Sequence, residues 1–175
     1  SREVCAKGGG VKGILLEMVV VLGALGLAQP TACEVVSDAA TTAVIGSGFV
    51  RKSTPMKGEG GQGMGTVCSR RKGKQLVQVT LLPGATDKGM SLQDMLKEQT
   101  KEAAEDSDSS IKIIVLPQTG VGDEAFSATV EAAQIKFSNV AVHKGKTMLF
   151  VQVFGTANTL ADALKLAKDG ASGLP

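Results

Sequence analysis

The sequence predicts an α+β domain in which an antiparallel sheet is flanked by helices on both faces. Two pairs of strand patterns, residues 67–71 with 75–82 and residues 133–142 with 147–154, are each joined by a short turn that contains glycine and lysine. Hairpins of this kind pair their strands antiparallel. Helical patterns stand before, between and after the strands, and this order is typical of the α+β class.

The composition indicates one globular domain in a chain of 175 residues. Hydrophobic residues make up 43% and charged residues 21%, which is ordinary for a protein with a buried core. Aromatic residues are only 3%, with no Trp and no Tyr, so a surface that stacks bases or sugars is not expected. The net charge of +2 speaks against a nucleic-acid partner, which normally requires a strongly basic face.

Residues 1–28 have the layout of a secretory signal. Two lysines precede an apolar stretch at residues 13–28, and the stretch ends in the small-residue sequence Gly-Leu-Ala. Glu17 interrupts it, and the uninterrupted part, residues 19–28, is shorter than the ~20 residues that span a bilayer. A cleaved signal is therefore expected, with residues 29–175 as a single exported domain; the alternative is a helix buried in the core.

The cysteines favour a disulfide over a metal site. Removal of the signal leaves two of the three cysteines, and an even pair in an exported chain predicts a bond between Cys33 and Cys68. Two free thiols in a reducing compartment are the alternative. Lipid modification of Cys33 would need an aliphatic residue where Pro30 stands. With no CxxC motif and a single histidine, neither a metal nor a cofactor is expected.

The segment ahead of the first hairpin is predicted to be a helix followed by a loop. Apolar residues recur at helical spacing over residues 33–45, and Gly46 follows as a helix stop. Residues 53–66 are rich in glycine and are predicted to form a mobile binding loop. They lack the Gly-Lys-Ser/Thr sequence of a phosphate-binding loop. The glycines expected to contact a partner are Gly58, Gly60, Gly61, Gly63 and Gly65.

Two further helices and two further strands complete the predicted fold. One helix covers residues 91–106 with Ser91 as its N-cap, and the other covers residues 159–169 and ends at Gly170. The additional strands are residues 111–116, which Pro117 ends, and residues 124–129.

Two short basic runs fall near the turns of the hairpins. Arg70-Arg71-Lys72 and Lys144-Gly145-Lys146 are predicted to be solvated hairpin ends, since charge runs are usually solvated. His143 precedes the second run and is expected to be exposed at a hairpin tip.

No constellation of residues indicates catalysis. Asp123 and Glu124 are adjacent, so their carboxylates should point to opposite faces of a strand, and Asp123 is expected to bond backbone amides in a turn. No GxSxG motif is present, and a serine nucleophile would have only His143 as its base. A hydrolase-like enzyme is therefore the least favoured function. The serines considered are Ser109, Ser127 and Ser138.

Three stretches together resemble a known group of exported domains. The first is CEVVSDAA at residues 33–40, the second is Cys68 at the head of a hairpin, and the third is GVGDEAFS at residues 120–127 followed by VHKGK at residues 142–146. They are similar to small exported bacterial domains of unknown function, many of them lipoproteins, that resemble the PsbP-like fold. PsbP is an extrinsic photosystem subunit, and other proteins of that fold bind partner proteins.

The resemblance covers about residues 33–170 and implies an antiparallel sheet between helices and a binding role. The chain departs from the group in its poor lipidation sequence and in the absence of aromatic residues around Cys68. The expected function is a non-catalytic periplasmic or cell-surface domain that binds a protein or an envelope component. Membrane contact is expected only through the signal or an anchor. The alternative is a carrier that holds a small apolar ligand in a pocket between sheet and helix.

Either the glycine-rich segment or a sheet face is expected to serve in binding. The polar residues expected to contribute to the binding site are Asp123, Glu124 and His143.

Overall fold

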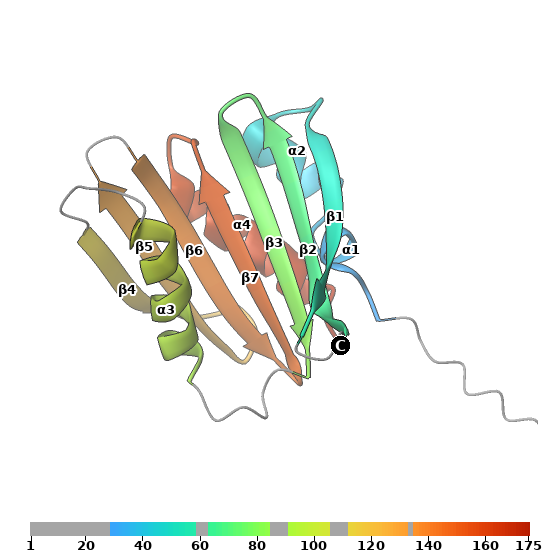
Figure 1. Ribbon diagram of the computed structural model, residues 1–175. Helices are drawn as coiled ribbons and strands as arrows, with labels where there is room; N and C mark the ends of the chain where they lie inside the picture. Colours follow the sequence, from blue (N-terminus) through green and yellow to red (C-terminus); the bar gives the residue numbers. More distant parts are fainter. Residues whose placement is uncertain (1–28, 59–62, 85–90, 106–111, 133–134) are drawn as a thin grey trace, which may run out of the picture.

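The computed structural model describes residues 29–58, 63–84, 91–105, 112–132 and 135–175 (Figure 1). The predicted signal at residues 1–28 therefore lies outside the described residues, as do Gly60, Gly61 and Ser109. Within the described part, the α+β class and the antiparallel sheet are confirmed.

Seven strands of the described chain form one antiparallel sheet in the order β1-β2-β3-β7-β6-β5-β4. Strands that follow one another in the sequence are neighbours in the sheet, with the exception of β3 and β4. β3 pairs instead with β7. This pair joins a meander of β1, β2 and β3 to a second meander of β4 to β7. The strands are β1 (Val50–Lys57), β2 (Gly63–Lys72), β3 (Gln75–Pro83), β4 (Lys112–Gln118), β5 (Glu124–Ala132), β6 (Ile135–Lys144) and β7 (Thr147–Phe154).

Among the residues that the structure describes, four helices pack against the sheet through two separate apolar clusters. The helices are α1 (Ala32–Val35), α2 (Asp38–Ile45), α3 (Leu92–Glu105) and α4 (Thr159–Ser172). The larger cluster joins α1, α2 and α4 to strand residues such as Val79 and Val151. The smaller cluster joins Leu92 and Leu96 of α3 to the alternate strand positions, such as Phe150. Figure 1 shows α3 in front of the sheet and α4 behind it.

The predicted helix over residues 33–45 is wrong in one respect, because the chain breaks between α1 and α2. Ser37 takes an extended conformation as the N-cap of α2, and its hydroxyl accepts a hydrogen bond from the Ala40 amide. A serine at this position satisfies an amide that has no partner within the helix, and a new helix therefore starts there. Apolar periodicity continues across such a break and does not reveal it.

The predicted glycine-rich loop is also wrong over most of its length. Residues up to Lys57 belong to β1, and residues from Gly63 onward belong to β2. The two strands pair antiparallel from Val50 opposite Arg71 to Lys57 opposite Gly63. β1 is mostly exposed and polar, so it lacks the apolar alternation by which strands are recognised in a sequence.

Two residues expected to end an element lie inside one. β4 continues through Pro117. Proline has no backbone N–H to donate, and an edge strand such as β4 tolerates this because it has a neighbouring strand on one side only. α4 continues through Gly170, which faces the sheet. A Cβ atom there would lie 2.8 Å from Leu149 Cδ2 and 3.0 Å from Val36 Cγ2. Close packing of α4, and not helix termination, accounts for this glycine.

Candidate functional site

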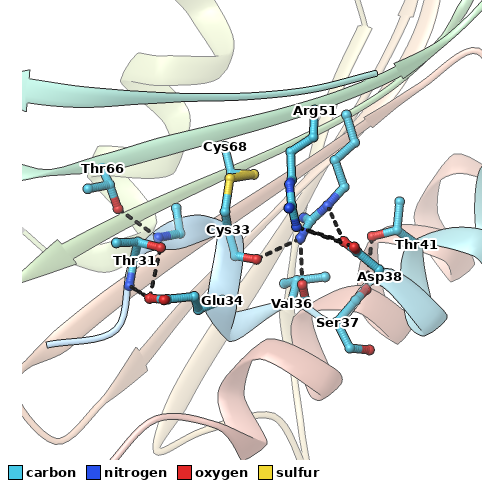
Figure 2. The surroundings of a disulfide bond; sticks show 12 residues. Thr31, Cys33, Glu34, Val36, Ser37, Asp38, Thr41, Arg51, Thr66 and Cys68 are labelled. Carbon is cyan, nitrogen blue, oxygen red and sulfur yellow. Dashed lines mark hydrogen bonds and ion pairs between the residues drawn. A yellow bond between two sulfur atoms is a disulfide. The ribbon is translucent and has the colours of Figure 1, made fainter. Parts of the chain in front are cut away.

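A disulfide attaches the N-terminal helix α1 to the sheet. Cys33 and Cys68 are bonded with their Cα atoms 5.0 Å apart, which confirms the predicted pair (Figure 2). The Ala32 amide donates to the hydroxyl of Thr66 at 2.7 Å, so a hydrogen bond supports the same attachment. Because the Cys33 sulfur is used in this bond, it is not available to carry a lipid.

Arg70 lies beside the disulfide and is fully buried, with 0% of its surface exposed. Its Nη2 donates to the carbonyl oxygens of Cys33 at 2.9 Å and Val36 at 2.6 Å, and its Nε lies 3.4 Å from Asp38 Oδ1. Burial lowers the pKa of Arg70, and the charge of Asp38 opposes this shift. The prediction that Arg70 is part of a solvated hairpin end is wrong, because Arg70 shares the inward face of β2 with Cys68.

The described glycines of the predicted binding loop have structural positions. Gly58 follows β1, and Gly63 and Gly65 lie within β2. Gly65 pairs with Met56, and a Cβ atom on Gly65 would overlap the carbonyl oxygen of Leu81. Gly65 is therefore required by the close approach of β3, whereas a Cβ on Gly63 would meet open space.

The structure brings Asp123, Glu124 and His143 together at one end of the β5–β6 pair. Glu124 is the Cα partner of His143, and the Asp123 amide donates to the His143 carbonyl at 2.8 Å. The Asp123 carboxylate accepts from the Gly145 amide at 2.7 Å, so it closes the next turn. His143 is half-buried inside β6, so the expectation that it is exposed at a hairpin tip is wrong. These residues are separated from Gly63 and Gly65 by the strands between β2 and β6.

Ser127 and Ser138, the two candidate serines that the structure describes, do not approach His143. Ser127 accepts from Gln118 Nε2 at 2.8 Å, and Ser138 bonds to Thr159 at 2.9 Å. Glu124 and His143 are direct partners, so Ser127 and Ser138, at odd spacing from them along β5 and β6, point to the other side of the sheet. Neither Ser127 nor Ser138 therefore forms a dyad with His143.

A small cleft of about 280 Å³ lies where the turn before β5 meets the end of α4. Lys144 contributes to it and donates from Nζ to the carbonyls of Ala171 and Leu174, both at 2.8 Å. Lys144 thus closes the C-terminal end of α4, where carbonyl groups lack partners within the helix. This cleft is accounted for by a structural contact. Its lining residues are Gly120, Val121, Gly122, Asp123, Lys144, Lys168, Ala171 and Ser172.

On the side of the sheet that α3 packs against, the area next to α3 is covered by no helix of the described residues. α3 packs on β4, β5 and β6, and the same side of β1, β2, β3 and the end of β7 continues past it (Figure 1). We call this surface the open face. Its side chains follow from the strand register and are Val50, Lys52, Thr54, Ser69, Arg71, Leu76, Gln78, Gln152 and Phe154.

One row of the open face combines apolar and cationic side chains. Val50, Arg71, Leu76 and Phe154 are successive Cα partners across β1, β2, β3 and β7. Val50 is 73% exposed, Arg71 is exposed, and Leu76 and Phe154 are half-buried. This row borders a cleft of about 430 Å³, which we call the hairpin cleft because Gly73 and Lys74 of the β2–β3 turn complete it.

The strands under the open face carry only positive charge. β1, β2, β3 and β7 contain no Asp and no Glu. In contrast, β1 and β2 contain six basic residues. Of these, Lys52 and Arg71 are exposed on the open face, whereas Arg51, Arg70 and Lys72 alternate to the opposite side of the sheet, where Arg51 pairs with Asp38. A net charge of +2 for the whole chain conceals this separation, which can favour a negatively charged ligand. The basic residues are Arg51, Lys52, Lys57, Arg70, Arg71 and Lys72.

The open face is not among the predicted sites, although two features of the sequence point to it. Alternation from Cys68 assigns Arg70 to the inner side of β2 and Arg71 to the outer side. The lack of acidic residues from Val50 to Lys57 and from Gly63 to Pro83 is visible in the sequence, apart from the intervening residues 58–62. What the sequence did not show was the β3–β7 pair, which adds Phe154 to the row.

None of the helices in the described part of the chain combines the length and apolar character that a bilayer-spanning segment needs. Comparison of the chain with protein-family models, with curated proteins and with solved structures finds no match.

Proposed function

We propose that this chain is an exported, non-catalytic binding domain that holds a protein or an envelope component on its open face. The observation that carries the proposal is the open face itself, a sheet surface with exposed Val50 and no acidic residue in its four strands. Surfaces that expose apolar groups next to charges of one sign serve in recognition.

Export is part of this proposal and is supported by the disulfide. Structural disulfides such as Cys33–Cys68 persist in oxidising compartments and are rare in the cytosol. The apolar layout of residues 13–28 supports the same conclusion. The PsbP-like assignment, with helices on both faces of the sheet, is proposed on the packing of α3 and α4 against alternate strand positions.

Absence of catalysis is proposed because three of the candidate residues have structural partners and the only described histidine lies on the other side of the sheet from both candidate serines. Asp123 closes a turn, Ser127 and Ser138 bond to other side chains, and His143 faces the side of the sheet opposite to both serines. A general base and a nucleophile must come within hydrogen-bond reach of each other to act together.

Photo-crosslinking in the native host tests the binding function. A photoreactive amino acid at Lys52, on the open face, is expected to yield a discrete crosslinked product in the envelope fraction. The same amino acid at Lys165, exposed on α4, is the matched control and is expected to yield none. Equal products from both positions, or none from Lys52, would contradict the proposal.

Intact mass spectrometry of the protein isolated from its host tests export. The chain is expected to begin near Gln29 and to gain mass on reduction as the Cys33–Cys68 bond opens. A chain that retains residues 1–28 and has free thiols would show that the compartment is reducing.

The second candidate, a carrier of a small ligand, is favoured by one observation. The hairpin cleft has an apolar floor of Leu76 and Phe154 and lies at the end of the sheet. Its volume of about 430 Å³ falls within the range of small-molecule sites, roughly 300–1,000 Å³.

A further inference from the structure

We propose that the hairpin cleft binds an acyl chain that carries one anionic group. This inference rests on the proposed binding function and names the chemical class of the ligand. It assigns the apolar chain to Leu76 and Phe154 and the anionic group to Arg71. The same chemistry occurs in a free fatty acid and in an anionic membrane lipid, and the experiment below separates these two sources.

The floor of the cleft suits an apolar chain. Leu76 and Phe154 are direct partners on β3 and β7, so their side chains lie side by side on one face. Both are half-buried and border the hollow, so a ligand would remove their remaining apolar surface from water. Val50, which is 73% exposed, extends the same row toward the sheet edge.

The rim of the cleft suits an anion. Arg71 is the direct partner of Leu76, and Lys74 borders the same hollow. The other two described arginines have assigned partners, since Arg51 pairs with Asp38 at 3.3 Å and Arg70 donates to two carbonyls. Among the described residues, no ion pair or side-chain hydrogen bond engages Arg71. A guanidinium can bind a carboxylate or a phosphate through two parallel hydrogen bonds.

The surroundings of the cleft disfavour other ligand classes. A cationic amphiphile would find no carboxylate in the four strands that form the open face. A nucleotide would find a single phenylalanine on the floor and no other ring to stack on. The cleft is a local hollow lined by five residues, so a small ligand fits it better than an extended protein surface.

Isothermal titration calorimetry with defined amphiphiles tests the proposal. Laurate, below its micelle concentration, is titrated into the protein purified from its host, and dodecyltrimethylammonium and dodecanol serve as cationic and neutral probes. Laurate is expected to bind with one molecule per chain and at least tenfold more tightly than either other probe. Amide chemical-shift changes on laurate addition are expected at Arg71, Lys74, Leu76 and Phe154.

Matched variants locate the two parts of the ligand. Arg71→Gln is expected to weaken laurate binding by about tenfold, the loss that follows removal of a hydrogen bond to a charged group. Lys165→Gln, on the exposed side of α4, is its control and is expected to leave binding unchanged. Phe154→Ala is expected to weaken all three probes, whereas Leu116→Ala, 48% exposed on β4, is expected to weaken none.

The outcomes separate the inference from the function on which it rests. Equal binding of laurate and the cationic probe, unchanged binding by Arg71→Gln, or shift changes confined to other strands would each overturn the ligand assignment. If laurate fails to bind while Lys52 still yields its specific crosslink, the binding function stands and the ligand class is wrong.

The source of the ligand is tested with vesicles. Sedimentation with vesicles of phosphatidylglycerol, but not of phosphatidylcholine, together with loss of sedimentation in Arg71→Gln, would assign the anion to a membrane lipid. Binding of monomeric laurate without sedimentation would assign it to a free fatty acid. Thermal unfolding of each variant verifies that Phe154→Ala is folded, and Arg71→Gln provides the test if it is not.

Discussion

The guanidinium of Arg70 donates a 2.6 Å hydrogen bond to the carbonyl oxygen of Val36, across 34 residues of sequence. Val36 lies at the break between α1 and α2, where backbone carbonyls have no partner within a helix. Arg70 also bonds to Cys33, whose side chain is linked to Cys68 two residues before Arg70 on β2. One strand face therefore fixes the N-terminal helices through both a covalent bond and a buried cation.

Replacement of Arg70 tests the energetic value of this contact. Arg70→Met keeps the length of the side chain and is expected to lower the free energy of unfolding by about 2–4 kcal/mol, because the carbonyls of Cys33 and Val36 lose their donor while remaining in place. The neighbouring Arg71→Met, on an exposed side chain, is expected to change it by less than about 0.5 kcal/mol. Urea denaturation measures both, and equal effects would show that the buried contact contributes little.

Removal of the disulfide is expected to be costly. The bond closes a loop with a sequence separation of 35 residues, and the loss of this restriction is worth about 4 kcal/mol in the chain-entropy model. The double variant Cys33→Ser with Cys68→Ser is expected to show this loss in guanidinium denaturation. The effect should be less than additive with Arg70→Met, because both changes release the same segment. Strict additivity would mean that the two contacts act independently.

Two glycines of β2 distinguish a structural role from a binding role. Gly65→Ala is expected to lower the free energy of unfolding by about 2 kcal/mol or more, because the new Cβ would overlap the Leu81 carbonyl. Gly63→Ala places its Cβ in open space, so it is expected to be neutral within about 0.5 kcal/mol. Thermal unfolding compares the two variants. Equal stability would show that β3 does not approach β2 as closely as described.

Acid should weaken the capping of α1 by Glu34. Its carboxylate accepts hydrogen bonds from the Thr31 amide at 2.7 Å and the Thr31 hydroxyl at 2.9 Å, and these bonds lower the pKa of Glu34 below its ordinary value of 4.5. A lowered pKa in the folded state contributes stability above the unfolded pKa, and this stability is lost as pH falls through the folded pKa. The stability difference between wild type and Glu34→Gln is therefore expected to be constant near neutral pH and to shrink below about pH 4.5. A difference that does not change between pH 7 and pH 3 would contradict this role.

Much of the fold could be predicted from the sequence because alternation and helical spacing are local signals. β3, α3 and the β6–β7 hairpin agree with their predicted bounds to within two residues, whereas β2 begins four residues before its predicted start and α4 ends three residues after its predicted end. β1 was missed because its side chains are mostly exposed and its end is rich in glycine. Such a strand is stabilised by its pairing with β2, and the residues of β1 alone do not indicate this pairing.

The candidate site was harder to predict because it depends on contacts between distant segments. The disulfide follows from cysteine counting, so Cys33 and Cys68 were identified. The hairpin cleft requires Phe154 to lie beside Leu76, and these residues meet only through the β3–β7 pair. The sequence predicts polar residues as the binding site instead, and one of these, Asp123, accepts a hydrogen bond from the backbone amide of Gly145.

The β3–β7 pair also constrains how the chain can reach its native state. Every other strand pair joins neighbours in the sequence and can close over a short loop, whereas β3 and β7 are separated by α3 and three strands. Closing a long loop costs entropy before any contact compensates for it, so folding slows as such pairings dominate. We therefore expect the two meanders to form first as separate ribbons, and we expect the pairing of β3 with β7 along Val79 and Val151 to limit the folding rate. Until that step, both ribbons have an unpaired edge, and a nascent chain has the greatest risk of pairing with a second molecule.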